Sequence, residues 1–115
     1  MNDMTNPEIE KSKPFISSEI IEYVPNSIEV KTILKKNTGT ISIMSFNSGE
    51  GHIEKTNPFD AFIQIIEGQA EIVINGISNT LHTGQAIVIP ANASKFVKPH
   101  GPFKMIQTVI KSGYE

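Results

Sequence analysis

Residues 60–76 read DAFIQIIEGQAEIVING, and this stretch decides the expected fold. It holds two runs rich in β-branched and apolar residues, 60–67 and 69–74, which a single glycine separates. The Asn-Gly dipeptide at 75–76 favours a two-residue type I′ hairpin turn, because glycine and asparagine tolerate positive φ angles. The stretch therefore predicts that 60–67 and 69–74 are paired antiparallel strands, and that 78–82 pairs back after the turn.

Similar short runs, bounded by turn residues, continue on both sides of this stretch. Regularly spaced short strands without long helical patterns are typical of an antiparallel sandwich or barrel. The run 86–90 is continuously apolar, which predicts a strand buried on both faces. The sequence thus predicts an all-β domain of about eight strands, and those outside the first stretch cover 27–35, 40–47, 86–90, 95–98 and 104–111.

Composition and length indicate one globular domain behind a polar tail. The chain has 115 residues, 38% of them hydrophobic and 19% charged, which suits a single packed core. Residues 1–14 are polar and are expected to form a flexible tail, with the barrel domain over 15–115. A short helical turn is expected within 16–23, with Ser17 or Ser18 as its N-cap.

The charge balance and the absence of cysteine exclude several classes of function. Ten lysines face twelve carboxylates, for a net charge of -2, with no arginine and no basic cluster, so we expect no nucleic-acid partner. Without cysteine there are no disulfides, thiolate ligands or cysteine nucleophile. No apolar stretch reaches signal-peptide or membrane-spanning length. These features predict a cytoplasmic protein without a membrane partner.

One series of spacings begins at a glycine just before the central strands. Five residues separate Gly49 from Lys55, and one separates Lys55 from Asn57. Three residues then separate Asn57 from Ala61, and six separate Ala61 from Gly68. Because alternate residues of a strand point to the same face, side chains at positions 55 and 57 would share a face.

A second series of spacings follows the central strands. Five residues separate Gly84 from Pro90, and Asn92 comes two positions later. Two residues separate Asn92 from Lys95, and three separate Lys95 from Pro99.

Together these series resemble the two signatures of the cupin superfamily, G-x5-H-x-H-x3,4-E-x6-G and G-x5-P-x-G-x2-H-x3-N, over roughly residues 41–110. The segments 54–61 and 90–95 are also similar to a subgroup of small bacterial single-domain cupins. The resemblance implies a double-stranded β-helix, or jelly-roll barrel, and a homodimer in which N-terminal strands add to the partner's sheet. Cupins with all four ligands hold a divalent metal, and many are dioxygenases, isomerases or epimerases, whereas others only bind or store.

The chain departs from the family at every metal-ligand position. Lys55, Asn57, Ala61 and Lys95 stand where the family has three histidines and a glutamate. A protonated lysine has no lone pair, and two lysines would oppose a divalent cation. We therefore expect no cofactor at this site. The alternative is a relocated divalent-metal site that uses His52 and Glu54.

We expect the interior pocket to be lined by lysine and a few neutral side chains: Lys55, Asn57, Phe62, Gln64 and Lys95. Burial and mutual repulsion would lower the pKa values of both lysines, and the pocket would suit a carboxylate, a phosphate or a reactive carbonyl. In the alternative, the lysines extend to the barrel mouth and pair with Glu54, Asp60 or water.

Two classes of function follow. The first is a metal-free small-molecule binding or sensing module that holds an anionic or carbonyl-bearing ligand between Lys55 and Lys95, and no catalytic residue is assigned in it. The second is an enzyme, either a metal-dependent oxygenase or isomerase with relocated ligands, or a lysine-dependent enzyme. The missing imidazoles favour the first class.

Overall fold

The computed structural model describes residues 9–47 and 54–113. The all-β class expected from the sequence is confirmed, and no described helix is long and apolar enough to cross a membrane. The elements of the described part are η1 (Ser17–Glu19), β1 (Ile28–Lys36), β2 (Gly39–Phe46), β3 (Lys55–Thr56), β4 (Asp60–Glu67), β5 (Gln69–Ile74), β6 (Ile77–His82), β7 (Ala86–Ile89), β8 (Ser94–Pro99) and β9 (Phe103–Ile110).

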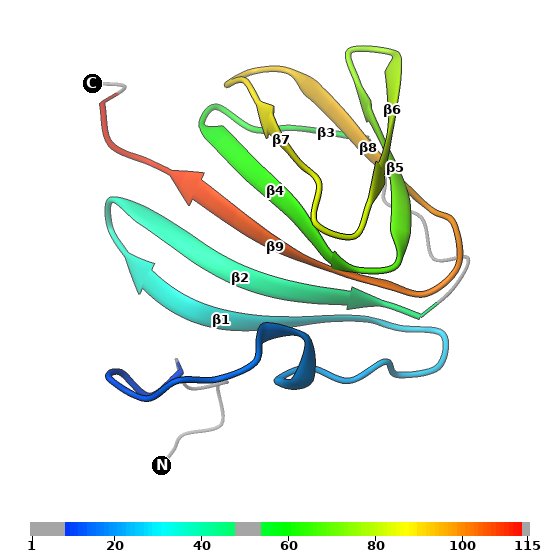
Figure 1. Cartoon of the computed structure of the whole chain (residues 1–115). Helices are drawn as coiled ribbons and strands as arrows, with labels where there is room; N and C mark the ends of the chain where they lie inside the picture. Colours follow the sequence, from blue (N-terminus) through cyan, green and yellow to red (C-terminus); the bar gives the residue numbers. More distant parts are fainter. Residues whose placement is uncertain (1–8, 48–53, 114–115) are drawn as a thin grey trace.

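The strands form two antiparallel sheets that face each other (Figure 1). The larger sheet has the order β1-β2-β9-β4-β7, and the smaller has the order β3-β8-β5-β6. The chain passes from one sheet to the other several times, as between β4 and β5. Two facing antiparallel sheets with such crossings form the jelly-roll arrangement, also called a double-stranded β-helix.

The expectation that 60–67 and 69–74 pair with each other is wrong. β4 pairs with β7 and β9, whereas β5 pairs with β6 and β8. Gly68 makes the corner at which the chain leaves one sheet for the other, with a φ of 90°. A Cβ at this position would lie 2.5 Å from the carbonyl oxygen of Pro102, so the corner requires glycine.

The Asn-Gly turn expected between β5 and β6 is confirmed. Asn75 and Gly76 have φ angles of 49° and 81°, which is the pair of positive values that a type I′ turn needs. The Asn75 Oδ1 atom also accepts a hydrogen bond from the Ser94 backbone amide at 2.9 Å. The hairpin tip is thereby joined to β8.

The core lies between the inner faces of the two sheets. Its central contact is a stack of Phe46 and Phe103, whose ring centroids are 4.4 Å apart and whose planes differ by 9°. Alternate residues of β4 to β9 supply most of the rest, because strand side chains point to opposite faces in turn. The other buried members are Ala61, Ile63, Ile65, Ala70, Ile72, Leu81, Ile89, Ala93, Val97, Met105 and Val109.

Two strands differ from expectation. β7 lies at an edge of the larger sheet, and its side chains alternate instead of being buried on both faces: Val88 is 64% exposed and Ile89 is 4% exposed. β3 has only two residues, too few for a pattern in the sequence to reveal it. This short strand is nevertheless the element that carries Lys55 into the site.

The N-terminal segment lies against the larger sheet and is held there by polar contacts. The expected helical turn is present as η1, but its N-cap is Ile16 and no side chain caps it, so the expectation of Ser17 or Ser18 as cap is wrong. The Ser45 hydroxyl donates to the Glu22 carbonyl at 2.7 Å. Of the predicted tail, residues 1–8 lie outside the described part, and residues 10–14 are exposed.

Lys104 is the buried cation of this N-terminal contact. Its Nζ atom donates to the Ser18 carbonyl at 2.6 Å, lies 3.9 Å from Glu67 Oε2 and lies 4.8 Å from the centroid of the Tyr23 ring. The Tyr23 hydroxyl donates to the same Glu67 oxygen at 2.6 Å. The buried Lys104 ammonium is thus stabilised by a carboxylate and by the face of an aromatic ring.

Candidate functional site

The candidate site begins with the short ladder between β3 and β8. Lys55 is opposite Lys95, and Thr56 is opposite Ser94. Directly opposed residues of an antiparallel pair project to the same face, so the two lysines share a face of the smaller sheet. On β8 this is the inner face, since Val97, two residues after Lys95, is fully buried.

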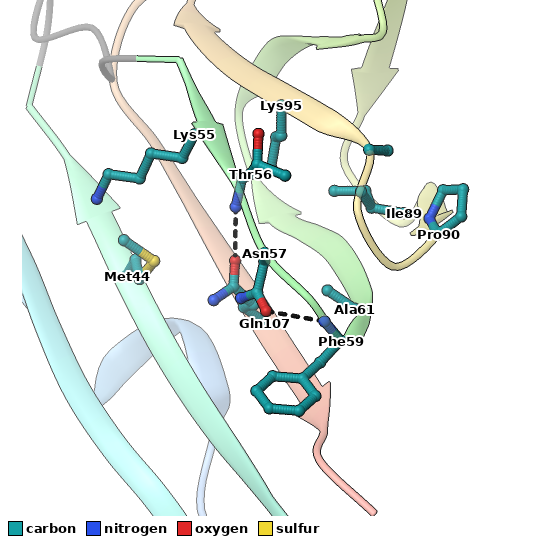
Figure 2. A pocket seen from close by; sticks show the side chains of 11 residues that line it. Met44, Lys55, Thr56, Asn57, Phe59, Ala61, Ile89, Pro90, Lys95 and Gln107 are labelled. Carbon is teal, nitrogen blue, oxygen red and sulfur yellow. Dashed lines mark hydrogen bonds between the residues drawn. The ribbon is translucent and has the colours of Figure 1, made fainter. Parts of the chain in front are cut away.

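Lys95 reaches across the interior to the larger sheet. Its Nζ atom donates a hydrogen bond of 3.1 Å to the amide oxygen of Gln107 on β9. Figure 2 shows this bond and the Lys55 side chain on the adjacent strand. Burial lowers the pKa of the Lys95 ammonium, and the positive charge of Lys55 lowers it further. Lys55 itself is exposed.

A cavity of about 230 Å³ lies at these two lysines. Its described lining contains both lysines and no aspartate or glutamate, so its fixed charges are positive. The remaining wall is apolar or neutral and comprises Met44, Thr56, Asn57, Phe59, Ala61, Ile89, Pro90, Ala93 and Gln107. A cavity with apolar walls and a few convergent polar groups is the usual form of a small-molecule site.

Backbone contacts join the loop before β4 to the turn before β8. The Asn57 carbonyl accepts from the Asn92 amide at 2.7 Å, and Asn57 Oδ1 accepts from the Phe59 amide at 3.0 Å. The Asp60 carboxylate accepts from the Ala91 amide at 2.8 Å. These bonds fix the cavity rim, and they place Asp60 in a structural role.

Asn92 stands where the second cupin signature has glycine. Its φ is 70°, in the left-handed region that asparagine enters more readily than other residues with a side chain. The turn therefore keeps the conformation for which glycine is otherwise used.

Phe62 and Gln64 were expected in the pocket, and the structure places them on the outer face of β4. Their neighbours Ala61 and Ile63 are buried inside, so strand alternation turns Phe62 and Gln64 outward. Phe62 is opposite Val88 of β7, and the Gln64 amide lies 3.5 Å from the Gly84 carbonyl. Of the five predicted pocket residues, the cavity brings together Lys55, Asn57 and Lys95.

Gln107 is a polar cavity residue that sequence reasoning missed, as is Thr56. The signal was present, since Phe103, Met105, Gln107 and Val109 alternate along one strand with three apolar members. A lone glutamine in such a series predicts a polar group on an interior face. Its partner, however, lies on a strand of the other sheet and is not identified by the pattern.

The described residues do not fit a metal at the motif positions. Lysine ammoniums and an alanine supply no ligand, and the Asn57 amide oxygen already accepts a backbone bond. Among the residues that the structure describes, no three His, Asp or Glu side chains are grouped to hold a metal. The relocated site proposed from His52 and Glu54 is not tested by this, because His52 lies outside the described residues.

The remaining described acidic and histidine groups do not line the cavity. The Glu54 carboxylate accepts from the Ser94 hydroxyl, and His82 is exposed at the end of β6. His100 is also exposed, and its Nε2 atom lies 3.1 Å from Glu71 Oε1. Both of these histidines are solvent-facing, as their positions beside turns predict.

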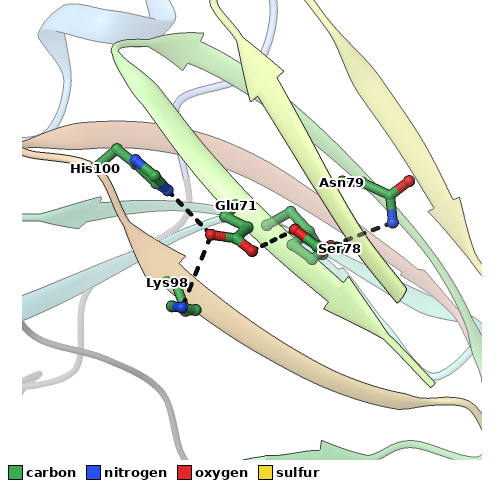
Figure 3. Close-up of polar contacts among 6 residues, drawn as sticks. Glu71, Ser78, Asn79, Lys98 and His100 are labelled. Carbon is green, nitrogen blue, oxygen red and sulfur yellow. Dashed lines mark hydrogen bonds and ion pairs between the residues drawn. The ribbon is translucent and has the colours of Figure 1, made fainter. Parts of the chain in front are cut away.

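Glu71 is the centre of a surface network on the outer face of the smaller sheet (Figure 3). It accepts from the Ser78 hydroxyl, contacts His100 and lies 3.9 Å from the Lys98 ammonium. The Ser78 hydrogen bond, followed by that from His100, lowers the pKa of the Glu71 carboxyl. Its neighbours Ala70 and Ile72 are buried, so this network is separate from the cavity.

Comparisons with known proteins support the fold through structure. No family model and no curated protein matches the sequence. A conserved Streptococcus pyogenes protein of unknown function superimposes with a TM-score of 0.85 at 25% identity, over 96% of this chain and 97% of that one. A cupin superfamily protein from Desulfitobacterium hafniense gives 0.82 at 23% identity, over 93% and 98%.

A cupin 2 conserved barrel domain protein from Leptotrichia buccalis superimposes with a TM-score of 0.78 at 28% identity, over 82% of this chain and 46% of that one. This chain therefore spans less than half of the Leptotrichia protein. The structural likenesses bear out the fold that the resemblance to the cupin signatures implied.

Proposed function

We propose that this small bacterial-type cupin is a metal-free binding or sensing module that holds a small anionic molecule between Lys55 and Lys95. The observation that supports the proposal is the composition of the cavity: two lysines line it, and its described lining has no carboxylate. Cupin folds serve both binding and catalysis, so the proposal depends on this site and not on the fold.

An anion would relieve a local electrostatic cost. Lys95 is half-buried beside a second cation, and its lowered pKa reflects both burial and that charge. A carboxylate or phosphate near both amines would supply the missing negative charge and accept their hydrogen bonds. Binding would then be coupled to uptake of a proton by Lys95 wherever its amine is partly neutral.

The size and walls of the cavity limit the ligand. Its volume of about 230 Å³ is below the roughly 300–1,000 Å³ of pockets for drug-sized ligands. The apolar side chains of Met44, Ala61 and Ile89 line part of it and would pack against a short carbon chain. We therefore propose a small organic acid or a small phosphate ester.

Calorimetry with propionate and with inorganic phosphate tests the proposal, using full-length protein purified without chelator. We expect binding that weakens in Lys95→Gln and in Lys55→Gln. Lys98→Gln is the matched control, because Lys98 lies on the outer face of the same strand as Lys95. Binding that is equally weakened by the control, or absent for both probes, would contradict the proposal.

Elemental analysis of the same preparation distinguishes this proposal from the metal-dependent alternative. Metal well below one equivalent per chain is expected. A stoichiometric divalent metal that survives dialysis would overturn the metal-free assignment and direct attention to His52 and Glu54.

A further inference from the structure

We propose that Lys95 condenses with the carbonyl of a small oxo acid, forming a reversible imine while Lys55 holds the acid's carboxylate. This inference rests on the proposed anion site and adds to it the substrate class and a covalent step. In the lysine-dependent enzyme considered from the sequence, Lys95 would then be the nucleophile and Lys55 the cation that binds the substrate's carboxylate.

The contacts of Lys95 are the first argument. Its Nζ atom faces the cavity and donates to Gln107 Oε1, the oxygen of an uncharged amide. Within residues 9–47 and 54–113, Lys95 makes no ion pair, whereas Lys98 and Lys104 are each paired with a glutamate. Lys95 is thus oriented by an uncharged acceptor, and among the described residues no carboxylate pairs with its charge.

The charges around Lys95 are the second argument. Lys55 on β3 is the other ionisable side chain in the described cavity lining. Glu54, which precedes it, has its carboxylate hydrogen-bonded to the Ser94 hydroxyl, and Glu71 lies on the far face of β5. Burial and the Lys55 charge lower the pKa of Lys95, which raises the fraction of neutral amine, the form that attacks a carbonyl.

Lys55 is suited to a different task. It is exposed and lies opposite Lys95 in the strand ladder, so its ammonium is available to a charged group at the cavity mouth. A carboxylate adjacent to a carbonyl would then contact Lys55 while the carbonyl carbon approaches Lys95. The two lysines differ in burial, and this difference assigns the nucleophile to Lys95 and the anion contact to Lys55.

The chemical step balances without a further reactant. The Lys95 nitrogen forms a bond to the carbonyl carbon, and the carbonyl oxygen becomes a hydroxyl in a carbinolamine. Loss of that hydroxyl with a proton releases water and leaves a carbon–nitrogen double bond, so both amine hydrogens depart with the oxygen. The step is a condensation with no change of oxidation state, and added water reverses it.

Reductive trapping tests the inference on the full-length protein. The protein is incubated with pyruvate and sodium cyanoborohydride, which reduces the imine to a stable secondary amine, and the adduct is located by peptide mass spectrometry. We expect one adduct per chain, at Lys95. Propionate, which has the carboxylate but no ketone, should give no adduct and should compete with pyruvate.

Two variants separate the covalent step from simple binding. Lys95→Arg keeps the positive charge but has no primary amine, so it should lose the adduct while retaining propionate binding. Lys98→Arg should leave the adduct unchanged. Circular dichroism and thermal melts of each variant establish that it is folded. If Lys95→Arg fails this check, Lys95→Gln replaces it, and this variant should lose the adduct and bind propionate more weakly.

The outcomes distinguish the inference from the binding proposal. Labelling spread over exposed lysines, or no labelling of a protein that binds propionate, would overturn the imine and leave the anion site standing. Absence of both labelling and propionate binding would overturn both. A single adduct at Lys95 that propionate suppresses supports both.

Discussion

Lys55 and Lys95 lie opposite each other on neighbouring antiparallel strands, and both line one cavity whose described wall has no carboxylate. Lys104, the buried lysine of the described part, has Glu67 and the Tyr23 ring beside it. Lys104 thus has a carboxylate beside it, whereas Lys95 has none in the described cavity wall. This difference supports a functional role for Lys95, which the following measurements test.

Lys95 should make the stability of the protein depend on alkaline pH. Because its pKa is lower in the folded state, the unfolded chain binds more protons between the folded pKa and the unfolded value of about 10.4. The free energy of unfolding contributed by Lys95 should therefore rise with pH across that window. Urea denaturation at several pH values should show this rise in wild type and its loss in Lys95→Met.

Lys36→Met is the control for this measurement, since Lys36 is exposed at the end of β1. The control should keep the wild-type pH dependence. If Lys95→Met and Lys36→Met behave alike, burial of the Lys95 ammonium does not influence stability.

Gln107→Glu should supply the charge that the cavity lacks. A carboxylate at 107 would lie within hydrogen-bond reach of the Lys95 ammonium, currently 3.1 Å from the amide oxygen, and would compete with an anionic ligand. We expect propionate affinity to fall by about tenfold or more, which is about 1.4 kcal/mol of binding free energy. Calorimetry measures the loss.

Gln64→Glu makes the same chemical change on the outer face of β4. It should leave propionate affinity within about twofold of wild type, a difference of less than about 0.5 kcal/mol. Equal losses in the two variants would mean that net charge, and not the cavity, controls binding.

Gly68 should be far less tolerant of alanine than Gly76. Both have positive φ, of 90° and 81°, which costs about 1–2 kcal/mol for a residue with a Cβ. At Gly68 the Cβ would also lie 2.5 Å from a backbone oxygen, whereas at Gly76 nothing lies within 4 Å. Urea denaturation should show a loss for Gly68→Ala that exceeds that for Gly76→Ala, and equal losses would contradict the close packing of this corner.

Glu71 should contribute acid-sensitive stability. The Ser78 and His100 hydrogen bonds hold the pKa of the Glu71 carboxyl in the folded state below its usual value, so its contribution is complete above the unfolded pKa and is lost as pH falls through the folded pKa. The difference in melting temperature between wild type and Glu71→Gln should shrink below about pH 4. A difference that is constant down to pH 2 would be inconsistent with this network.

The homodimer implied by the cupin resemblance remains a prediction. β1 forms one edge of the larger sheet, and an edge strand of nine residues can be extended by a strand of another chain. Light scattering after size-exclusion chromatography should give twice the mass of one chain. A monomer mass at micromolar concentration would rule out a stable dimer.

The sequence identified individual strands better than their partners. Asn75-Gly76 set a hairpin correctly because its turn chemistry is local, whereas the runs on either side of Gly68 were paired wrongly. A glycine between two strands is compatible with a hairpin and with a corner between sheets. The difference depends on Pro102 and Phe103, which pack against Gly68 and are distant in sequence.

The candidate site was predicted in part for the same reason. Motif spacing located Lys55, Asn57 and Lys95, since the framework fixes which positions face inward. Phe62 and Gln64 were placed inward against the alternation that Ala61 had already set.

By itself, the sequence determined the all-β class, because strand periodicity and turn residues are local properties of the chain. Through its resemblance to the two cupin signatures, it also predicted the jelly-roll framework and the replacement of the cupin metal ligands. Only the tertiary structure decided that Lys95 meets Gln107 across the interior and that its charge lacks a carboxylate in the described wall. Burial and electrostatic environment are sums over residues from strands far apart in sequence, and they exist only once the two sheets have packed together.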